Sequence, residues 1–189
     1  MFKLYPTSIL DVFVIQPNRN TDPRGDLYEL FNERVFPLNT KFDIKQVTYS
    51  TSKRGTIRGF HVQPGMSKVM MVLKGHAILS TVDIRPSSPS YKQIVNVPIN
   101  AKNELKMVYA PDWAARGFIA LEDDTTILYF QDGTFNRELS VGFNWASPEV
   151  EIKPWVYSGI DPHDYVISDK DKVLPMFSDF ENPFARAIV

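Results

Sequence analysis

The sequence predicts an all-β domain of the jelly-roll type. Short segments of alternating apolar and polar residues recur along its 189 residues, and no long segment carries a helical period. Fourteen prolines, nine glycines and 13% aromatic residues favour short strands joined by firm turns. Roughly ten strands at close spacing are typical of a sandwich or barrel, and a jelly roll can enclose a cavity for a small ligand.

The expected strands follow one another along the chain. The first covers residues 9–17, a turn-rich loop over 18–25 follows, and a second strand covers 26–31. A single helical turn is expected within 32–39. Further strands are expected at 42–50, 56–62, 68–73, 77–85, 91–99, 104–110, 115–121, 126–131 and 139–144. Residues 151–189 are richer in proline and acid, and we expect them to wrap on the domain as a tail.

Composition excludes several classes of function. The net charge of −1 creates no strong field for nucleic acid or an anionic membrane, and no stretch has the apolar length that spans a bilayer. The chain has no cysteine, which excludes disulfides, thiolate metal sites and a cysteine nucleophile. The composition is compatible with a cytoplasmic location.

His61 is the first candidate for chemistry, within RGTIRGFHVQPGMSK (54–68). Strict alternation predicts that His61 shares an inward face with Ile57, while Arg58 lies on the other face. Taken alone, such a histidine is more often buried and bonded to backbone than catalytic. A metal site would need companion ligands, yet His76 lies at an expected turn and His163 in the tail, so we expect no metal.

Two arginines and a lysine could bind anions. Arg24 and Arg58 each precede a glycine, and paired arginines suit the oxygens of a phosphate, although Arg24 alone is more typical of a surface turn. Lys68 begins an apolar strand, where its ammonium can either reach solvent or stabilise an oxyanion inside a cavity.

Tyr129 and the tail carboxylates could serve proton transfer. Tyr129 lies in the apolar strand TILYFQ, where a tyrosine usually packs with one hydrogen bond but can act as an acid facing a cavity. Asp169 and Asp171 lie in VISDKDKVLP, which by itself reads as a solvated loop. If the tail folds back, one carboxylate could stand behind His61 and raise its basicity.

Six motifs occur in order over about residues 10–175, almost the whole chain. They are DPRGDLYELF, GTIRGFHVQ, SKVMMVLKGHAILSTVDIRPSSPSY, APDWAARGFIAL, LYFQDGTFNRELSVGFNWASP and VISDKDKVLP. Each is weak alone. Together they resemble the dTDP-4-dehydrorhamnose 3,5-epimerase family, with its D-x-R-G-x-F-x-E-x-F opening and its G-x-x-R-G-x-H-x-Q core.

The resemblance implies a metal-free cupin jelly roll without a cofactor, which forms homodimers and acts on a nucleotide-diphosphate sugar. The implied reaction removes a proton next to the C4 ketone of a 4-keto-6-deoxy sugar and returns one from the opposite face. We therefore expect one domain over 1–189. Residues 1–50 would form the dimer, 51–150 the barrel, and 151–189 a tail packed over the site.

The resemblance also assigns roles to individual residues. His61 matches the base, Asp171 its dyad partner and Tyr129 the opposing acid, while Lys68 matches the lysine near the developing enolate. The matching substrate-binding positions are Arg24 and Arg58 for the diphosphate, Gln46 on the substrate side, Glu29 and Phe135 near the nucleotide, and Arg116 in the cavity.

Four positions depart from the family pattern. Arg116 replaces the histidine of A-H-G-F, Leu79 an aspartate, Thr48 an asparagine and Phe135 a tyrosine. Arg116 and Leu79 are expected to alter the polar lining of the cavity. The departures leave three alternatives open: epimerisation at C3 only, a sugar ketoisomerase, or a nucleotide-sugar-binding cupin without turnover. Ketoisomerases of this group generally show a pair of nearby histidines, and this chain has none.

Overall fold

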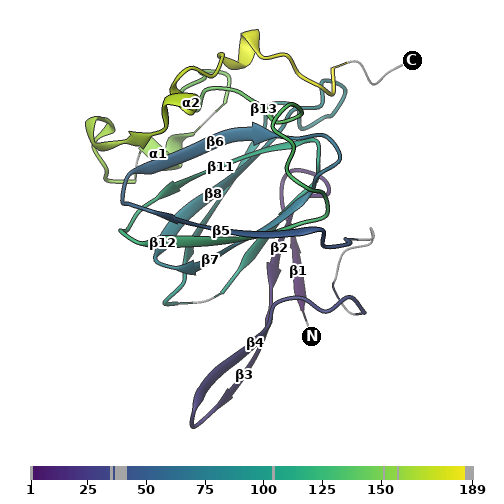
Figure 1. Cartoon of the computed structure of the whole chain (residues 1–189), viewed down its shortest axis with the longest axis vertical. Helices are drawn as coiled ribbons and strands as arrows, with labels where there is room; N and C mark the ends of the chain where they lie inside the picture. Colours follow the sequence, from purple (N-terminus) through teal and green to yellow (C-terminus); the bar gives the residue numbers. More distant parts are fainter. Residues whose placement is uncertain are drawn as a thin grey trace.

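A computed structural model of the chain confirms the expected all-β jelly roll (Figure 1). It describes residues 2–34, 36, 42–103, 105–150, 152–156 and 158–185. Within this part, two six-stranded sheets form the barrel, and a two-stranded hairpin projects from it. No helix in this part has both the length and the apolar composition that a membrane span requires.

The first sheet contains the N-terminal strands and the central strands that carry Lys68 and Tyr129. Its neighbouring strands are antiparallel. In spatial order it consists of β1 (Lys3–Pro6), β2 (Phe13–Gln16), β10 (Met107–Ala110), β7 (Lys68–Lys74), β12 (Thr125–Gln131) and β5 (Gln46–Ser52).

The second sheet faces the first and carries His61 and Arg116. In spatial order it consists of β13 (Val141–Gly142), β6 (Thr56–Val62), β11 (Ala114–Ala120), β8 (His76–Asp83) and β9 (Ile94–Asn100). A two-residue strand of the tail, β14 (Val166–Ile167), adds to β6 in parallel.

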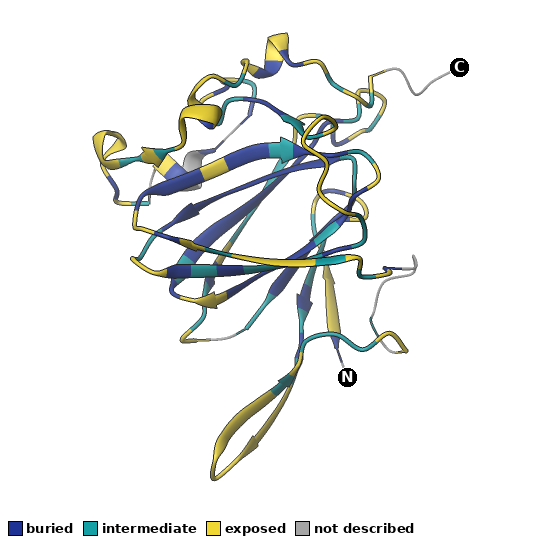
Figure 2. Ribbon diagram, in the orientation of Figure 1, coloured by how far each residue is buried: buried dark blue, intermediate teal, exposed yellow. Residues whose placement is uncertain are grey.

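The N-terminal region differs from the expected elements. The single strand expected at 9–17 is wrong, because β1 and β2 form an antiparallel pair and Asp11, with φ of 66°, turns the chain between them. The loop expected at 18–25 is also wrong. Most of it is strand β3 (Asn18–Asp22), which pairs with β4 (Gly25–Glu29). The hairpin stands away from the barrel and is largely exposed, so its residues carry no apolar alternation (Figure 2).

The other expected strands exist with ends that differ by a few residues, as strand ends depend on pairing partners. Of the helical turn expected at 32–39, residues 35 and 37–39 lie outside the described residues, as does residue 104 of the strand expected at 104–110. The described residues of the tail form the short helical turns α1 (Lys153–Val156), η1 (Pro162–Asp164), α2 (Asp169–Lys172) and η2 (Phe177–Asp179).

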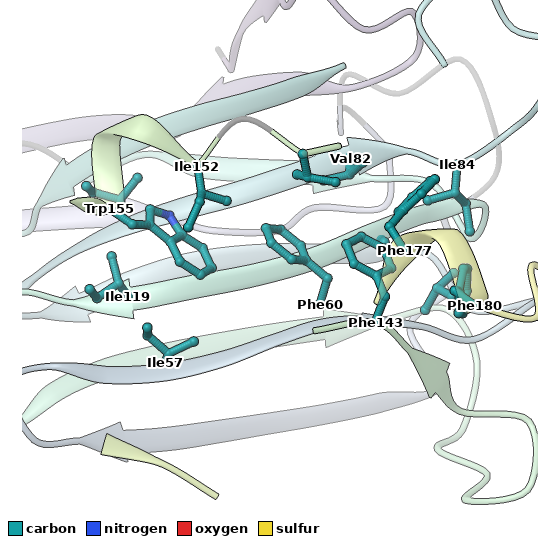
Figure 3. Close-up of a cluster of buried hydrophobic side chains, with 14 of the residues drawn as sticks. Ile57, Phe60, Val82, Ile84, Ile119, Phe143, Ile152, Trp155, Phe177 and Phe180 are labelled. Atoms are coloured by element: carbon teal, nitrogen blue, oxygen red, sulfur yellow. The ribbon is translucent and has the colours of Figure 1, made fainter. Parts of the chain in front are cut away.

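Three apolar clusters hold these elements. One fills the barrel between the sheets and includes Met70, Leu79 and Phe118. Another covers the outer face of the first sheet around Met71. The third lies on the outer face of the second sheet, where tail residues pack against β6, β8 and β11 (Figure 3).

Phe60 is central to the outer cluster of the second sheet. Its ring stacks between Phe143 and Trp155, with both centroid distances 5.2 Å. Trp155, on the tail helix α1, is fully buried and donates from Nε1 to Ser80 Oγ at 2.8 Å. Burial of large aromatic rings stabilises a fold strongly. This stack therefore holds the tail against the outer face of β6 (Figure 3).

Candidate active site

Strand β6 changes face in its middle. Two of its residues, Gly59 and Phe60, lie opposite one residue of β11, Gly117, while the flanking positions Arg58 and His61 pair regularly. One extra residue on a strand is a β-bulge, and a register shift of one residue sends the following side chains to the other face.

The bulge decides where His61 points. Ile57 and Phe60 pack in the outer cluster, whereas Arg58 and His61 both line a cavity on the barrel side. The prediction that His61 shares a face with Ile57 and opposes Arg58 is therefore wrong. Strict alternation fails because it does not anticipate the extra residue at Gly59.

Gly59 is required at the bulge by its backbone. Its φ is +122°, which L residues rarely adopt. A Cβ at this position would lie 2.6 Å from the Cα of Gly117 and 2.7 Å from the carbonyl oxygen of Arg116. The close approach of β6 and β11 at this point therefore depends on two glycines in register.

His61 is bonded to a carboxylate of the tail. Its Nε2 lies 2.8 Å from Oδ1 of Asp171, whose side chain is only 5% exposed. Gly59 N–H donates to the other carboxylate oxygen at 3.3 Å. Burial acts to raise the pKa of Asp171, but the hydrogen bonds from His61 and Gly59 outweigh it and lower this pKa. An ionised Asp171 accepts from Nε2–H, which leaves Nδ1 as the basic nitrogen of His61.

The tail positions Asp171 through two local features. β14 pairs with β6, with Ile167 beside Ile57, and thereby holds the following residues along the edge of the second sheet. Ser168 caps α2 by accepting from the N–H of Asp171 at 3.2 Å. Asp169, two residues earlier, is fully exposed and pairs with Lys172, so only one of the two aspartates reaches His61.

One cavity of about 300 Å³ gathers the candidate catalytic side chains, and this volume suits a small ligand. Lys68 enters from β7 and Tyr129 from β12, across the barrel from β6. The cavity is lined by Arg58, His61, Lys68, Met70, Arg116, Gly117, Phe118, Tyr129, Ser168, Lys170 and Asp171. Its one carboxylate, Asp171, is already bonded to His61, so the lining as a whole is cationic.

Tyr129 is placed to keep its proton. Burial raises the pKa of Tyr129 above its ordinary value, against the opposing effects of a hydrogen bond with Ser50 and the charge of Arg58. The Tyr129 hydroxyl lies 3.3 Å from Ser50 Oγ. The phenol is therefore neutral near pH 7 and available as a donor.

A second pocket adjoins the first and shares Lys68 and Tyr129 with it. Gln46 and Phe135 line this pocket, and Gln46 Oε1 accepts from the backbone N–H of Phe135 at 2.8 Å. The ring of Phe135 is half exposed, so one of its surfaces is free to stack on a planar ligand.

The structure keeps Arg24 and Glu29 away from both pockets. Arg24 lies at the tip of the hairpin, where its side chain is 89% exposed and pairs with Asp22 at 2.6 Å. Glu29, at the base of the hairpin, accepts from Asn32 Nδ2 at 2.8 Å. The hairpin projects away from the barrel (Figure 1), and Arg24 does not line the cavity that Arg58 lines, so within one chain the expected arginine pair does not form.

The two main departures from the family pattern behave differently. Arg116 lines the cavity, as expected. Leu79 is fully buried in the core between the sheets, so the expectation that it alters the polar lining is wrong. Its apolar side chain packs where an aspartate would need a partner.

Ser50 and Ser52 are site residues that sequence reasoning missed. Ser50 meets Tyr129, and Ser52 Oγ accepts from Nε of Arg58 at 3.4 Å. The signal is present in the sequence, because residues 46, 48, 50 and 52 are all polar and alternate on one face of β5.

The barrel and the proteins that match the chain define its class, a sugar epimerase among the isomerases. The comparisons identify the group: the family model dTDP-4-dehydrorhamnose 3,5-epimerase matches residues 6–179. The chain belongs to the dTDP-4-dehydrorhamnose 3,5-epimerase family.

Individual relatives resemble the chain over nearly its full length. The dTDP-4-dehydrorhamnose 3,5-epimerase of Methanothermobacter thermautotrophicus is 31% identical, over 90% of this chain and 92% of that protein. The crystal structure of the enzyme from Elizabethkingia anophelis matches with a TM-score of 0.86 at 28% identity, covering 96% of this chain and 98% of that chain. A Legionella pneumophila structure in complex with dTDP-4-keto-L-rhamnose has a TM-score of 0.85 at 25% identity, covering 93% of each chain.

Proposed function

We propose that the protein inverts C3, or C3 and C5, of a dTDP-linked 4-keto-6-deoxyhexose. The observation that carries this proposal is the His61–Asp171 pair, which shares one cavity with Tyr129 and Lys68. The Legionella relative, whose structure holds dTDP-4-keto-L-rhamnose, supports the choice of substrate.

His61 is the proposed base. A proton next to a ketone is acidic enough for an imidazole to remove it once the resulting enolate is stabilised. Asp171 keeps the proton on Nε2 and stabilises the imidazolium that forms, as a buried carboxylate does for a catalytic histidine.

Tyr129 is the proposed acid and Lys68 the group at the C4 oxygen. Tyr129 stands on the first sheet and His61 on the second, so a sugar bound between them presents opposite faces to base and acid. Return of the proton from Tyr129 inverts the carbon. Lys68 lies between the two pockets, where its ammonium can meet the developing oxyanion.

The charges of the site suit a nucleoside diphosphate. Arg58, Lys68, Arg116 and Lys170 line a cavity whose one carboxylate is engaged by His61. We assign the diphosphate to Arg58, because a guanidinium matches phosphate oxygens in geometry and charge. The adjoining pocket, with Gln46 and Phe135, is the proposed binding site of the nucleotide's aromatic base.

Solvent exchange tests this function directly. Incubation with dTDP-4-keto-6-deoxyglucose in D2O should place deuterium at C3, or at C3 and C5, as read by NMR. Exchange at C3 alone would assign the chain to epimerisation at one carbon. A keto group that moves to C3 would indicate a ketoisomerase. Binding of the sugar nucleotide in calorimetry without exchange at either carbon would contradict the proposal and favour a binding module.

We also propose that the active unit is a homodimer in which the hairpin serves the partner's site. Arg24 and the exposed Leu27 lie on the hairpin, which projects from its own barrel (Figure 2). Val47 and Tyr49 are exposed on β5, the strand whose residues Gln46 and Thr48 line the second pocket. A projecting hairpin with exposed apolar and cationic side chains suits contact with a second copy. The cytoplasmic location stays a prediction from the sequence.

Subunit complementation tests the dimer. Arg24→Ala and His61→Ala variants should each be weakly active. If Arg24 acts in the partner's site, mixed dimers contain one site with both side chains and recover activity. A monomer in sedimentation, or mixed dimers as inactive as the parents, would contradict this arrangement.

A further inference from the structure

Arg116 is a buried guanidinium in the wall of the cavity. It lies on β11 opposite His61, and only 5% of the residue is exposed. Its Nη2 donates to two backbone carbonyls, that of Met66 at 2.8 Å and that of Pro111 at 2.7 Å. These bonds hold the group in one orientation, and its Nε–H is buried without a hydrogen-bond partner in the described part of the structure.

The charge of Arg116 is permanent at neutral pH. Burial lowers its pKa to about 10, while Asp112, Asp132 and Tyr109 favour the charged form. The two carboxylates also accept from backbone N–H groups, Asp112 from Gly65 at 2.9 Å and Asp132 from Ser67 at 2.7 Å. Nη2 donates to neutral carbonyls and not to a carboxylate, and although Asp112 and Asp132 offset part of the charge, Arg116 still acts on Lys68.

Lys68 shares the cavity with this guanidinium and is not comparably fixed. Its Nζ lies 5.9 Å from the centre of the Tyr129 ring. Burial is the main cause that lowers the pKa of Lys68 to about 7, and the charge of Arg116 adds to it. A lysine in this state exchanges its proton readily near neutral pH, as catalytic lysines do.

We infer that Arg116 is a positioning residue for the epimerase reaction: it supplies the fixed positive charge of the cavity and thereby lets Lys68 pass a proton to and from the C4 oxygen. This inference rests on the proposed function. It gives a role to the residue at which the chain departs from the A-H-G-F pattern, because an arginine keeps its charge where a histidine would titrate.

Every proton and electron pair of the proposed reaction has a donor and an acceptor. His61 takes the proton from the carbon, the C–H electron pair becomes the new C=C bond, and the C=O electrons move to O4. Lys68 gives one proton to O4, which leaves a neutral amine and an enol. In the second half, Lys68 recovers that proton while Tyr129 delivers its own to the opposite face of the carbon. Solvent then returns the proton from His61 to Tyr129.

Several charged or titratable groups face Lys68 and must be counted in any pH dependence. They are Arg58 and His61 from β6, Arg116 from β11, Tyr129 from β12, and Lys170 and Asp171 from α2. Asp171 is already paired with His61, so the cationic groups dominate around Lys68.

Direct titration of Lys68 tests the inference without turnover. In protein labelled with ¹³C at lysine Cε, the resonance absent from Lys68→Met identifies Lys68. We expect it to titrate near pH 7, to shift upward by about one unit in Arg116→Gln, and to stay in place in Arg116→Lys. Arg137→Gln, an exposed arginine, is the matched control. Titration of wild-type Lys68 at an ordinary lysine value near 10 would overturn the inference, even if Arg116→Gln does not fold.

The pH profile of exchange in D2O tests the same point in catalysis. The wild-type rate should fall as pH rises through the pKa of Lys68. In Arg116→Gln the maximal rate should drop by about tenfold, and the falling limb should move to higher pH. Arg116→Lys should restore both. An unchanged limb in Arg116→Gln would overturn the inference. If the wild type catalyses no exchange at any pH, the proposed function fails, and the titration still decides whether Arg116 controls Lys68.

Discussion

Asp171 and His61 are 110 residues apart in sequence and 2.8 Å apart in space, through Oδ1 and Nε2. The contact requires the tail to run beside β6, which it does through β14 and through the aromatic stack around Phe60. The proposed base is thus assembled from a barrel strand and from the tail that packs behind it.

Asp171→Asn should reduce the rate of exchange by about 10²- to 10⁴-fold, because an amide does not hold the proton on Nε2 or stabilise the imidazolium. The measurement is deuterium incorporation at C3 and C5 by NMR. Asp169→Asn, on the same helix turn but fully exposed, is the control and should stay near wild type. Equal rates for the two variants would remove Asp171 from the mechanism.

Tyr129→Phe should separate exchange from inversion. Without the phenol, His61 can still remove and return a proton on its own face, so deuterium enters while the inverted product falls by about 10²- to 10⁴-fold. NMR of the same sample gives both quantities. Tyr91→Phe, at a tyrosine that packs on the outer cluster of the second sheet and lines neither pocket, is the matched control. A parallel loss of exchange and inversion would point to a structural role for Tyr129.

Gly59→Ala should destabilise the fold and disturb the site together. The positive φ alone costs about 1–3 kcal/mol, and the new Cβ would meet the backbone of β11 at 2.6 Å. Gly25→Ala isolates the conformational cost, because Gly25 has φ of +128° and no atom within 4 Å of its Cβ position. Urea unfolding should show a clearly larger loss for Gly59→Ala, and equal losses would contradict the close approach.

Asp83 should make the fold sensitive to acid. This buried carboxylate accepts from Arg85 Nη2 at 2.8 Å and from the hydroxyls of Ser88 and Ser90 at 2.6 Å each. Burial acts to raise the pKa of Asp83, but these hydrogen bonds together lower it to about 2. A carboxyl whose pKa is lower in the folded state stabilises the protein above its unfolded pKa near 4, and this contribution disappears as pH falls towards 2.

The expected size of that effect is roughly 2 kcal/mol, from the shift in pKa between the two states. Urea unfolding at pH 6 and pH 3 should show about half of this contribution lost, because pH 3 still lies above the folded-state pKa of Asp83. Asp83→Asn should be less stable at pH 6 and should depend less on pH, whereas Asp124→Asn, at an exposed ion pair with Lys74, should follow the wild type. If Asp83→Asn lost as much stability as the wild type between pH 6 and pH 3, groups other than Asp83 would cause the acid sensitivity.

Much of the barrel was predictable because its signals are local. The strand expected at 56–62 coincides with β6, and β7, β8, β11 and β12 lie within one or two residues of the expected ranges. Runs of apolar residues, alternating or continuous, mark strands that are buried, and most residues of β6, β7, β8 and β11 are buried. Strand β3 of the hairpin was missed since it is polar and largely exposed, whereas β4 overlaps the strand expected at 26–31.

The candidate site was predictable in membership more than in geometry. The motifs indicated His61, Lys68, Tyr129 and Asp171, which line one cavity. Period-two reasoning put His61 inward, as the structure does, but wrongly gave it the face of Ile57 and not that of Arg58, because the bulge at Gly59 depends on the pairing with β11. Arg24 and Glu29 share the motif order of the others and yet lie outside the cavity of their own chain.

The sequence by itself determined the all-β class, most of the strands, the family and the residue types available for proton transfer. Those properties depend on alternation, composition and short motifs, which any segment displays without its neighbours. Tertiary structure alone decided that Arg58 and His61 share the cavity face of β6, that the tail brings Asp171 within hydrogen-bond distance of His61, and that backbone carbonyls hold the guanidinium of Arg116 in the wall of the same cavity. Each of these depends on contacts between strands or segments distant in sequence, whose register and burial no local pattern encodes.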